Sequence, residues 1–387
     1  MDEKILYMMP DGSDFHFNEI KDENRVVYIS WSKKEIYKSY EKMFYDFYKC
    51  GECLLNEICL EDEDYEKTDM WFLATLYLVR HSFELALKSL LLKEFNGKKD
   101  IIKTHDISSL FREYTKFEKI PLNKVEIDWL VKYFKSIASI DLNSDNFRFE
   151  FSGEFVTRFS RQLLDKELIT YNCEQAFYLL DKCIKKDINL NEENLNLNED
   201  SDFIIDNGNY YDCLIDQKPY NRGFYEKIKG YIGASDFLYN CQDIDDNTKF
   251  FPIIFLCRNV IELTLKYIYF LPLTGITKEL SEKYHNHIIY KKLWNNIKDV
   301  IYDYSRKTNQ NLEVLKGVEI ILIELEALDK EGLKFRYPTD CSLNYYYNQK
   351  KFDIKHIYEH LRMLINALVG IDSILEMASE YEMDLNR

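Results

Sequence analysis

Two nine-residue stretches carry arginine, glutamate and lysine at steps of four residues. The six charged residues are Arg80, Glu84, Lys88, Arg258, Glu262 and Lys266. Because four residues advance a helix by little more than one turn, the three charges of each stretch share one helix face. Such a face can form a polar cleft in which arginine grips a phosphate and a carboxylate or histidine transfers protons. The alternative is that the charges pair with one another and stabilise an otherwise apolar helix.

Histidines distinguish the two stretches. His81 follows Arg80 in the first stretch, whereas the second has Asn259 at that position. A single acid–base centre therefore belongs to the first stretch. We expect Arg80 to stabilise a phosphate and His81 to transfer protons, with Glu84 and His105 completing the catalytic set.

Net charge limits the way in which this chain can bind nucleic acid. The 51 Lys and Arg against 67 Asp and Glu give −16, so RNA needs a local basic surface. The expected RNA-binding residues are Lys88, Lys98, Lys99, Lys103, Arg148, Arg258, Lys266 and Arg336. The lysines around residue 98 also fit a solvated helix end, where cations complement the helix dipole.

Two metal or redox chemistries compete with this reading. His81, the pair His105-Asp106 and Asp141 follow the order seen in helical metal-dependent phosphohydrolases, but the second half of the chain has no His-Asp pair. Cys50 and Cys53 have redox or zinc spacing without a second such pair at finger distance. We therefore expect packed, reduced thiols and no cofactor or metal.

Other enzyme classes and a membrane protein are disfavoured. The sequence has no phosphate-cradling glycine loop, no His-Glu-x-x-His and no Gly-x-Ser-x-Gly. Its longest apolar run, 250–273, is interrupted by the charges of the second stretch. Nine scattered cysteines and an acidic N-terminus without a secretory pattern predict a reducing cytoplasm.

The elements that must position these residues are mostly helices. Only 12 Gly and 6 Pro are present, too few for the frequent turns of an all-β fold. Helical segments are expected at about 70–95, 105–116, 123–139, 168–185 and 353–380. Turn residues at Pro10-Asp11-Gly12 and at Asn207-Gly208-Asn209 predict two short β-hairpins.

Similar blocks recur in the two halves. Residues 80–88 match 258–266 in Arg, Glu, Leu, Leu and Lys at an offset of 178, and 147–149 (Phe-Arg-Phe) match 335–337 (Phe-Arg-Tyr) at an offset of 188. Two blocks in the same order indicate an internal duplication. The expected organisation is a small β element at 1–31, a bundle at 32–186, an acidic linker and hairpin at 187–212, and a second bundle at 213–387.

The motifs resemble those of bacterial HEPN-like helical domains over about 35–185 and 220–380. The first half carries Arg80-His81-x-x-Glu84-Leu85-x-Leu87-Lys88, His105-Asp106-x-x-x-Leu110 and Phe147-Arg148-Phe149. The second carries Leu256-x-Arg258-x-x-x-Glu262-Leu263-x-Leu265-Lys266 and Phe335-Arg336-Tyr337-Pro338. The resemblance implies a mainly α fold of two repeated four- to five-helix HEPN-like bundles, each preceded by a short β-hairpin. The bundles would pair within the chain as a pseudo-dimer, which could dimerise further.

The resemblance also implies a function in bacterial antiviral defence or a toxin–antitoxin system. Many HEPN-like proteins cleave RNA without metal, using an arginine followed after four to six residues by a histidine. None of the seven histidines here has such an arginine. The expectation is an RNA-targeting protein, with metal-independent endoribonuclease activity as its chemistry and an antitoxin or defence component as partner. The alternative is a catalytically inactive helical scaffold that binds a partner protein.

Overall fold

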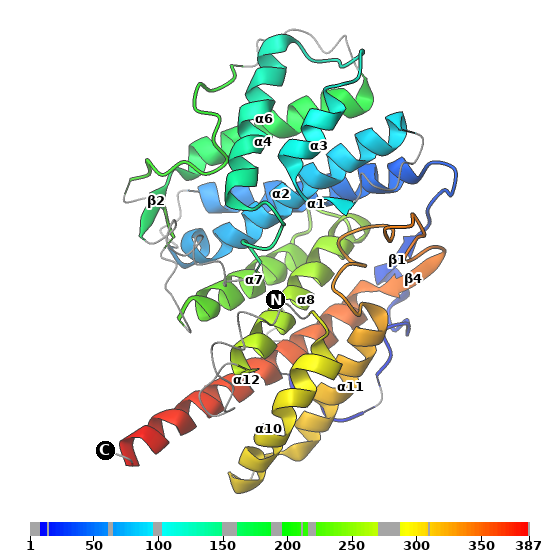
Figure 1. The fold of residues 1–387 in the computed structure, drawn as a ribbon. Coiled ribbons are helices and arrows are strands. Elements are labelled where there is room, and N and C mark those ends of the chain that lie inside the picture. Colours follow the sequence, from blue (N-terminus) through cyan, green and yellow to red (C-terminus); the bar gives the residue numbers. More distant parts are fainter. Residues whose placement is uncertain are drawn as a thin grey trace. The chain divides into compact units, whose positions relative to one another are not determined.

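The computed structural model is mainly helical, as the sequence predicts. It describes residues 8–13, 15–60, 65–95, 103–148, 161–186, 196–209, 212–215, 222–269, 287–308 and 310–385. Every structural statement below refers to these residues. Figure 1 shows their helices and strands in chain order.

The chain divides into two compact units, each of which is discontinuous in sequence. We call Ile29–Pro252 together with Tyr337–Gln349 the N-unit. We call Met1–Tyr28, Ile253–Arg336 and Lys350–Arg387 the C-unit. The described residues of the predicted linker, 196–209 and 212, belong to the N-unit, and the helix that follows them packs against a helix of the first half. Residues 187–195 and 210–211 lie outside the described residues.

Six complete helices lie in the described residues of the N-unit. They are α1 (Ile36–Cys59), α2 (Tyr65–Glu94), α3 (Ile107–Tyr114), α4 (Lys124–Ile140), α6 (Lys166–Lys185) and α7 (Arg222–Asn240). Helices α1 and α2 pack along one another, and α7 also packs against α2. Every residue from Phe72 to Leu92 is buried, so α2 is the central helix of the unit.

Local sequence signals set the ends of several of these helices. The Asp106 carboxylate caps α3 by accepting the Ser109 N–H at 3.1 Å, and Asn123 forms a capping box with Glu126 at the start of α4. Asp165 caps α6 in the same way. The predicted segments at 105–116, 123–139 and 168–185 therefore lie close to the observed helices.

One residue without a side chain allows the close approach of α1 and α2. A Cβ built on Gly51 would lie 2.7 Å from Cγ2 of Val79. Real Cβ atoms do not approach that closely, so a larger residue would push the two helices apart. This contact lies one residue from Arg80 and helps to fix the position of the charged face of α2.

The strands of the N-unit pair differently from the prediction. Strand β2 (Gln162–Leu164) runs antiparallel to β3 (Cys213–Ile215), with Leu163 opposite Leu214. Residues 203–206 form no strand; instead, the Gly208 N–H donates to the Leu163 carbonyl at 3.0 Å. The expected hairpin about Asn207-Gly208 is thus replaced by a loop that lies against β2.

The C-unit contains the later helices and the N-terminal segment. Its helical elements are η2 (Glu23–Arg25), the part of α8 (Asp246–Tyr269) from Ile253 onward, the π-helical segment η5 (Ile289–Trp294), α10 (Asn295–Lys307), α11 (Leu312–Leu328) and α12 (Ile354–Leu385). Strand β1 (Val26–Ile29) pairs with β4 (Lys350–Asp353). The N-terminal hairpin expected about Pro10-Asp11-Gly12 needs residues before Met8, which lie outside the described residues.

Helix α8 is the buried counterpart of α2. Every described residue from Lys249 to Tyr269 is buried.

In the part of the chain that the structure describes, no helix is both long enough and apolar enough to cross a bilayer.

Candidate functional site: a buried glutamate with an exposed histidine partner

Helix α2 presents its three regularly spaced charges to the interior of the N-unit. Arg80 and Glu84 are 0% exposed and Lys88 is 1% exposed. Charged side chains are almost never this deeply buried unless they are paired. The face of α2 that carries them is therefore an internal ionic network, not an open surface.

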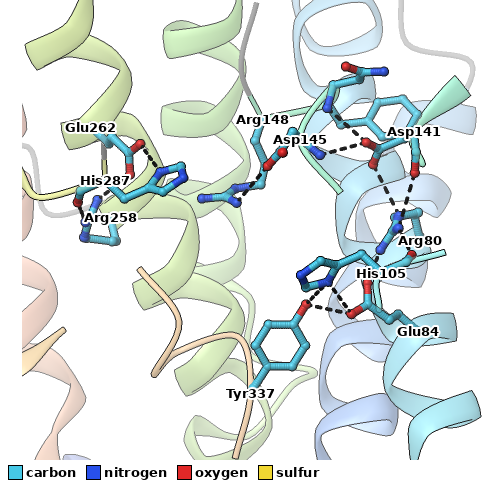
Figure 2. A network of polar contacts seen from close by, with 12 residues as sticks. Arg80, Glu84, His105, Asp141, Asp145, Arg148, Arg258, Glu262, His287 and Tyr337 are labelled. Atoms are coloured by element: carbon cyan, nitrogen blue, oxygen red, sulfur yellow. Dashed lines mark hydrogen bonds and ion pairs between the residues drawn. The ribbon is translucent and has the colours of Figure 1, made fainter. Parts of the chain in front are cut away.

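Glu84 is the centre of this network. Its Oε1 atom lies 2.9 Å from His105 Nδ1 and 2.7 Å from the hydroxyl of Tyr337, while Oε2 accepts from Arg80 Nη1 (Figure 2). Oε1 also lies 2.7 Å from Lys88 Nζ. Tyr337 belongs to the N-unit although it is 253 residues away in sequence. Four side chains from three separate segments thus converge on one buried carboxylate.

Arg80 connects α2 to two neighbouring backbone segments. Its Nη2 atom donates to the carbonyl of His105 at 2.6 Å and to that of Asp141 at 3.3 Å. Its Nε atom lies 3.3 Å from Asp141 Oδ2 in an ion pair that lacks hydrogen-bond alignment. The guanidinium therefore holds both the loop before α3 and the end of α4 against α2.

The network keeps Glu84 ionised despite its burial. Burial alone raises the pKa of a carboxyl group, but the charges of Lys88, His105 and Arg80 lower the pKa of Glu84 well below its usual range. Burial likewise opposes the charge of Arg80, whereas Glu84 and Asp141 raise the pKa of the guanidinium. The buried charges therefore depend on one another.

His105 is the member of the network that reaches solvent. Its side chain is 32% exposed, in contrast to the buried Glu84. The Nδ1 atom faces Glu84 and Tyr337, and Nε2 has no partner among the described residues. A carboxylate at Nδ1 favours the tautomer that carries its proton there, which leaves Nε2 as a free base. This arrangement suits general acid–base chemistry at the surface.

A second network of the same composition lies in the C-unit. Glu262 Oε1 lies 2.6 Å from Lys266 Nζ and 2.7 Å from His287 Nδ1, and its Oε2 lies 2.9 Å from Arg258 Nη1. The Nη2 atom of Arg258 donates to the carbonyl of His287 at 2.7 Å. The His287 side chain is 34% exposed, and Lys266, His287 and Arg258 lower the pKa of the buried Glu262 well below its usual range.

An aspartate ends the helix that precedes each Phe-Arg-aromatic motif. Asp141 follows α4, and its Oδ1 atom accepts the N–H groups of residues 145 and 146 at 2.8 and 3.0 Å. Asp329 follows α11, and its Oδ1 atom accepts the N–H groups of residues 333 and 334 at 3.0 and 3.1 Å. These contacts fold the turns that lead to Arg148 and Arg336.

His81 does not share the accessible position of His105. It is fully buried, with its ring 4.8 Å from the Phe47 ring, 5.6 Å from Tyr77 and 5.1 Å from Tyr337. This aromatic enclosure leaves the predicted proton-transfer residue no path to a substrate in solvent. Of the two histidines expected to be catalytic, only His105 meets the solvent.

The residues expected to bind RNA are mostly inside the protein. Lys88, Arg148, Arg258, Lys266 and Arg336 are all between 1% and 4% exposed. Lys103 is exposed, two residues before His105. Lys98 and Lys99 lie outside the described residues, so the predicted basic surface is represented by Lys103 alone.

The competing metal and redox readings find no support in the geometry. Among the described residues, no three His, Cys, Asp or Glu side chains are arranged to hold a metal ion. Asp106 caps α3, and Asp141 accepts backbone N–H groups. The Sγ atom of Cys53 contacts that of Cys241 at 3.6 Å rather than Cys50, which is buried.

Tyr337 and His287 are the participants that the sequence analysis did not single out as functional. Tyr337 is the aromatic residue of the second Phe-Arg-aromatic motif, and His287 is the second histidine of His285-Asn286-His287. Both motifs were visible in the sequence, but nothing in it indicated contact with a glutamate.

No protein-family model, curated protein or solved structure matches the chain.

Proposed function

We propose that this chain is a tandem HEPN-like protein of a bacterial defence or toxin–antitoxin system that acts on RNA, and that His105 is its proton-transfer residue. The observation that carries the proposal is a one-third exposed imidazole whose Nδ1 atom is held by a buried, ionised Glu84. Catalysis with this group requires no metal. The proposal assigns the protein to a reducing cytoplasm, in keeping with its nine free cysteines.

Matching contacts support an internal duplication. The two Arg-Glu-Lys-His networks join equivalent atoms, including an arginine that donates to the carbonyl of the network histidine in each. At a constant offset of 188, Asn123 and Asn311 cap α4 and α11, and Asp141 and Asp329 end them. At the same offset, Asp165 and Asp353 accept the N–H groups of residues 168 and 356. Two HEPN-like bundles in one chain would explain all of these pairs.

The chemistry follows from the free Nε2 atom of His105. As a general base it would take the proton of an RNA 2′-hydroxyl, whose oxygen then attacks the adjacent phosphorus. The bond to the 5′-oxygen breaks, and the leaving oxygen takes up a proton from a water molecule, which regains it from the protonated His105; the products are a cyclic phosphate and a free 5′-hydroxyl. In this scheme the exposed Lys103 attracts the phosphate, and Arg80 positions the backbone of His105 instead of touching the substrate.

A second function, a catalytically inactive scaffold for a partner protein, is favoured by a different observation. Nearly all of the repeated charges are buried and paired, as in a network that serves the fold. The two functions differ in whether the exposed histidine is needed for more than stability.

RNA cleavage in EDTA separates the two functions. Purified protein is incubated with tRNA and with total RNA, and His105→Ala is compared with the matched variant His287→Ala. Cleavage by the wild type and by His287→Ala, lost in His105→Ala, supports the enzyme. Absence of cleavage together with a stoichiometric co-purifying protein supports the scaffold, and cleavage only after added metal contradicts the His105 mechanism.

A further inference from the structure

Tyr337 reaches the first network from a distant part of the sequence. The segment Tyr337–Gln349 belongs to the N-unit, although the residues on both sides of it belong to the C-unit. Within the N-unit, this segment is attached at several points: Tyr40 bonds Thr339 through their hydroxyls at 2.9 Å, and Asn348 accepts the Trp31 N–H at 2.8 Å. Tyr337 therefore enters the network from an anchored segment.

The hydroxyl of Tyr337 lies within hydrogen-bond distance of the His105 ring, where it can favour one tautomer of that ring. It is 2.7 Å from Glu84 Oε1 and 3.0 Å from His105 Nδ1 (Figure 2). A hydroxyl has one hydrogen to donate and can also accept. When Tyr337 donates to Glu84, its oxygen is left to accept from Nδ1–H, so both neighbours of Nδ1 act as acceptors.

The ring of Tyr337 has a separate role in packing. Lys88 Nζ lies 4.6 Å from the ring centroid in a cation–π contact, and the His81 ring meets it edge to face. Replacement by phenylalanine would keep these ring contacts and remove only the hydroxyl. At the corresponding position of the first Phe-Arg-aromatic motif, the chain has Phe149.

We propose that Tyr337 is a positioning residue that fixes the tautomer and orientation of His105, with Nδ1 protonated inside the network and Nε2 free at the surface. The structural part of this proposal stands on the contacts alone. Its consequence for catalysis rests on the proposed function of His105. The hydroxyl gives the first network an acceptor for Nδ1–H in addition to the carboxylate.

Nitrogen NMR of the imidazoles tests this role directly. Spectra of wild type and Tyr337→Phe are recorded well above pH 6.5, where an imidazole is ordinarily neutral. We expect Tyr337→Phe to increase the Nε2–H tautomer of His105 severalfold and to leave His287 unchanged. Tyr133→Phe, which removes a buried hydroxyl that donates to the Cys173 Sγ atom in the same unit, should leave the His105 tautomer unchanged. Identical His105 spectra in wild type and Tyr337→Phe would overturn the proposal.

Kinetics separates this proposal from the proposed function. If the wild type cleaves RNA, Tyr337→Phe should reduce kcat about tenfold with little change in KM, and Tyr133→Phe should not. An unchanged kcat would overturn the catalytic consequence. A shifted tautomer in a protein that cleaves no RNA would overturn the proposed function and support the positioning role.

A separate observation concerns Cys53 of α1 and Cys241, the residue after α7. Their sulfur atoms are 3.6 Å apart within the N-unit, and both residues are partly exposed. The two thiols are thus in contact, although they are 188 residues apart in sequence. A small shift would bring them to the 2.05 Å of a disulfide.

We propose that Cys53 and Cys241 form a reversible disulfide when the protein meets a peroxide. The Cys241 thiolate attacks hydrogen peroxide to give a sulfenic acid and water, because burial raises the pKa of Cys53 to about 12 and so disfavours its thiolate. The Cys53 thiol then displaces a second water to form the S–S bond. The two thiols lose two electrons and two protons, and the peroxide is reduced to two waters. The bond would join α1 to the end of α7.

Mass spectrometry of peroxide-treated protein tests the disulfide. The background variant is Cys341→Ser, because Cys341 is exposed and could link two molecules. We expect a loss of about 2 Da, a linked peptide containing Cys53 and Cys241, and reversal by dithiothreitol. The linked peptide should be absent in Cys53→Ser and Cys241→Ser. Full alkylation of both thiols after treatment, or a link to Cys50 instead, would overturn the proposal.

Discussion

The two Arg-Glu-Lys-His networks share a core and differ at its edge. In both, a buried glutamate binds an arginine and a lysine on its own helix and a one-third exposed histidine from a following loop. In the first network the hydroxyl of Tyr337 contacts both the glutamate and the histidine, and His81 follows the arginine, where the second network has Asn259. We infer that the shared arginine, glutamate, lysine and histidine stabilise each unit. A function specific to the first network would depend on the residues in which it differs, Tyr337 and His81.

The largest loss of stability is expected when the carboxylate at the centre of either network is removed. Glu84→Gln and Glu262→Gln each leave a buried arginine and lysine without their counter-charge, so each should lower the free energy of unfolding by about 3–5 kcal/mol. Urea unfolding measures this change. Glu113→Gln, which removes an exposed partner of Lys116, is the control and should change the stability by less than about 0.5 kcal/mol. A change of that small size in either network variant would contradict a structural role for its core.

Replacing the aspartates that end α4 and α11 should lower the free energy of unfolding by similar amounts. Each loss should be smaller than that caused by replacing a glutamate. Asp141→Ala and Asp329→Ala each remove an oxygen that accepts two backbone N–H groups, at an expected cost of about 1–3 kcal/mol. Thermal unfolding of the two variants makes the comparison. A large effect at one aspartate and none at the other would break the equivalence of the two regions.

Acid should weaken both networks through their glutamates. The folded-state pKa values of Glu84 and Glu262 lie well below 4.5, so the unfolded chain binds more protons between those values and 4.5. The stability contributed by each carboxylate is therefore fully present above pH 4.5 and is lost as the pH falls toward its folded-state value.

Urea midpoints measured from pH 7 down to pH 3 test this dependence. Wild type should lose stability below pH 4.5, and Glu84→Gln and Glu262→Gln should each lose less over the same range. A variant that is as sensitive to acid as wild type would contradict the assignment of the effect to its carboxylate.

Local signals in the sequence predicted the helices well and the strand pairing poorly. Caps such as Asp106 and Asn123 act within a few residues, so the ends of α3 and α4 could be predicted. The partners of β1 and β3 lie elsewhere in the chain, and turn residues carry no information about such pairing. The turn at Gly208 was therefore read as a hairpin, whereas the structure pairs β3 with β2.

Most residues of the candidate site were predictable from the sequence, but the contact with Tyr337 was not. The four-residue spacing identified Arg80, Glu84 and Lys88, and His105 was among the expected catalytic residues. The spacing left open both a polar cleft and a set of charges that pair with one another, and the structure shows the paired, buried charges. Tyr337 was missed because the fold brings it to Glu84 from the other half of the sequence.

The central claim is that His105, held by Glu84 and Tyr337, performs chemistry that its counterpart His287 does not. The most direct test is the ratio of kcat/KM for RNA cleavage without metal between His287→Ala and His105→Ala. We predict that His287→Ala retains activity within about threefold of wild type, whereas His105→Ala loses at least about 100-fold, as for a general base. Equal activity of the two variants would contradict the claim.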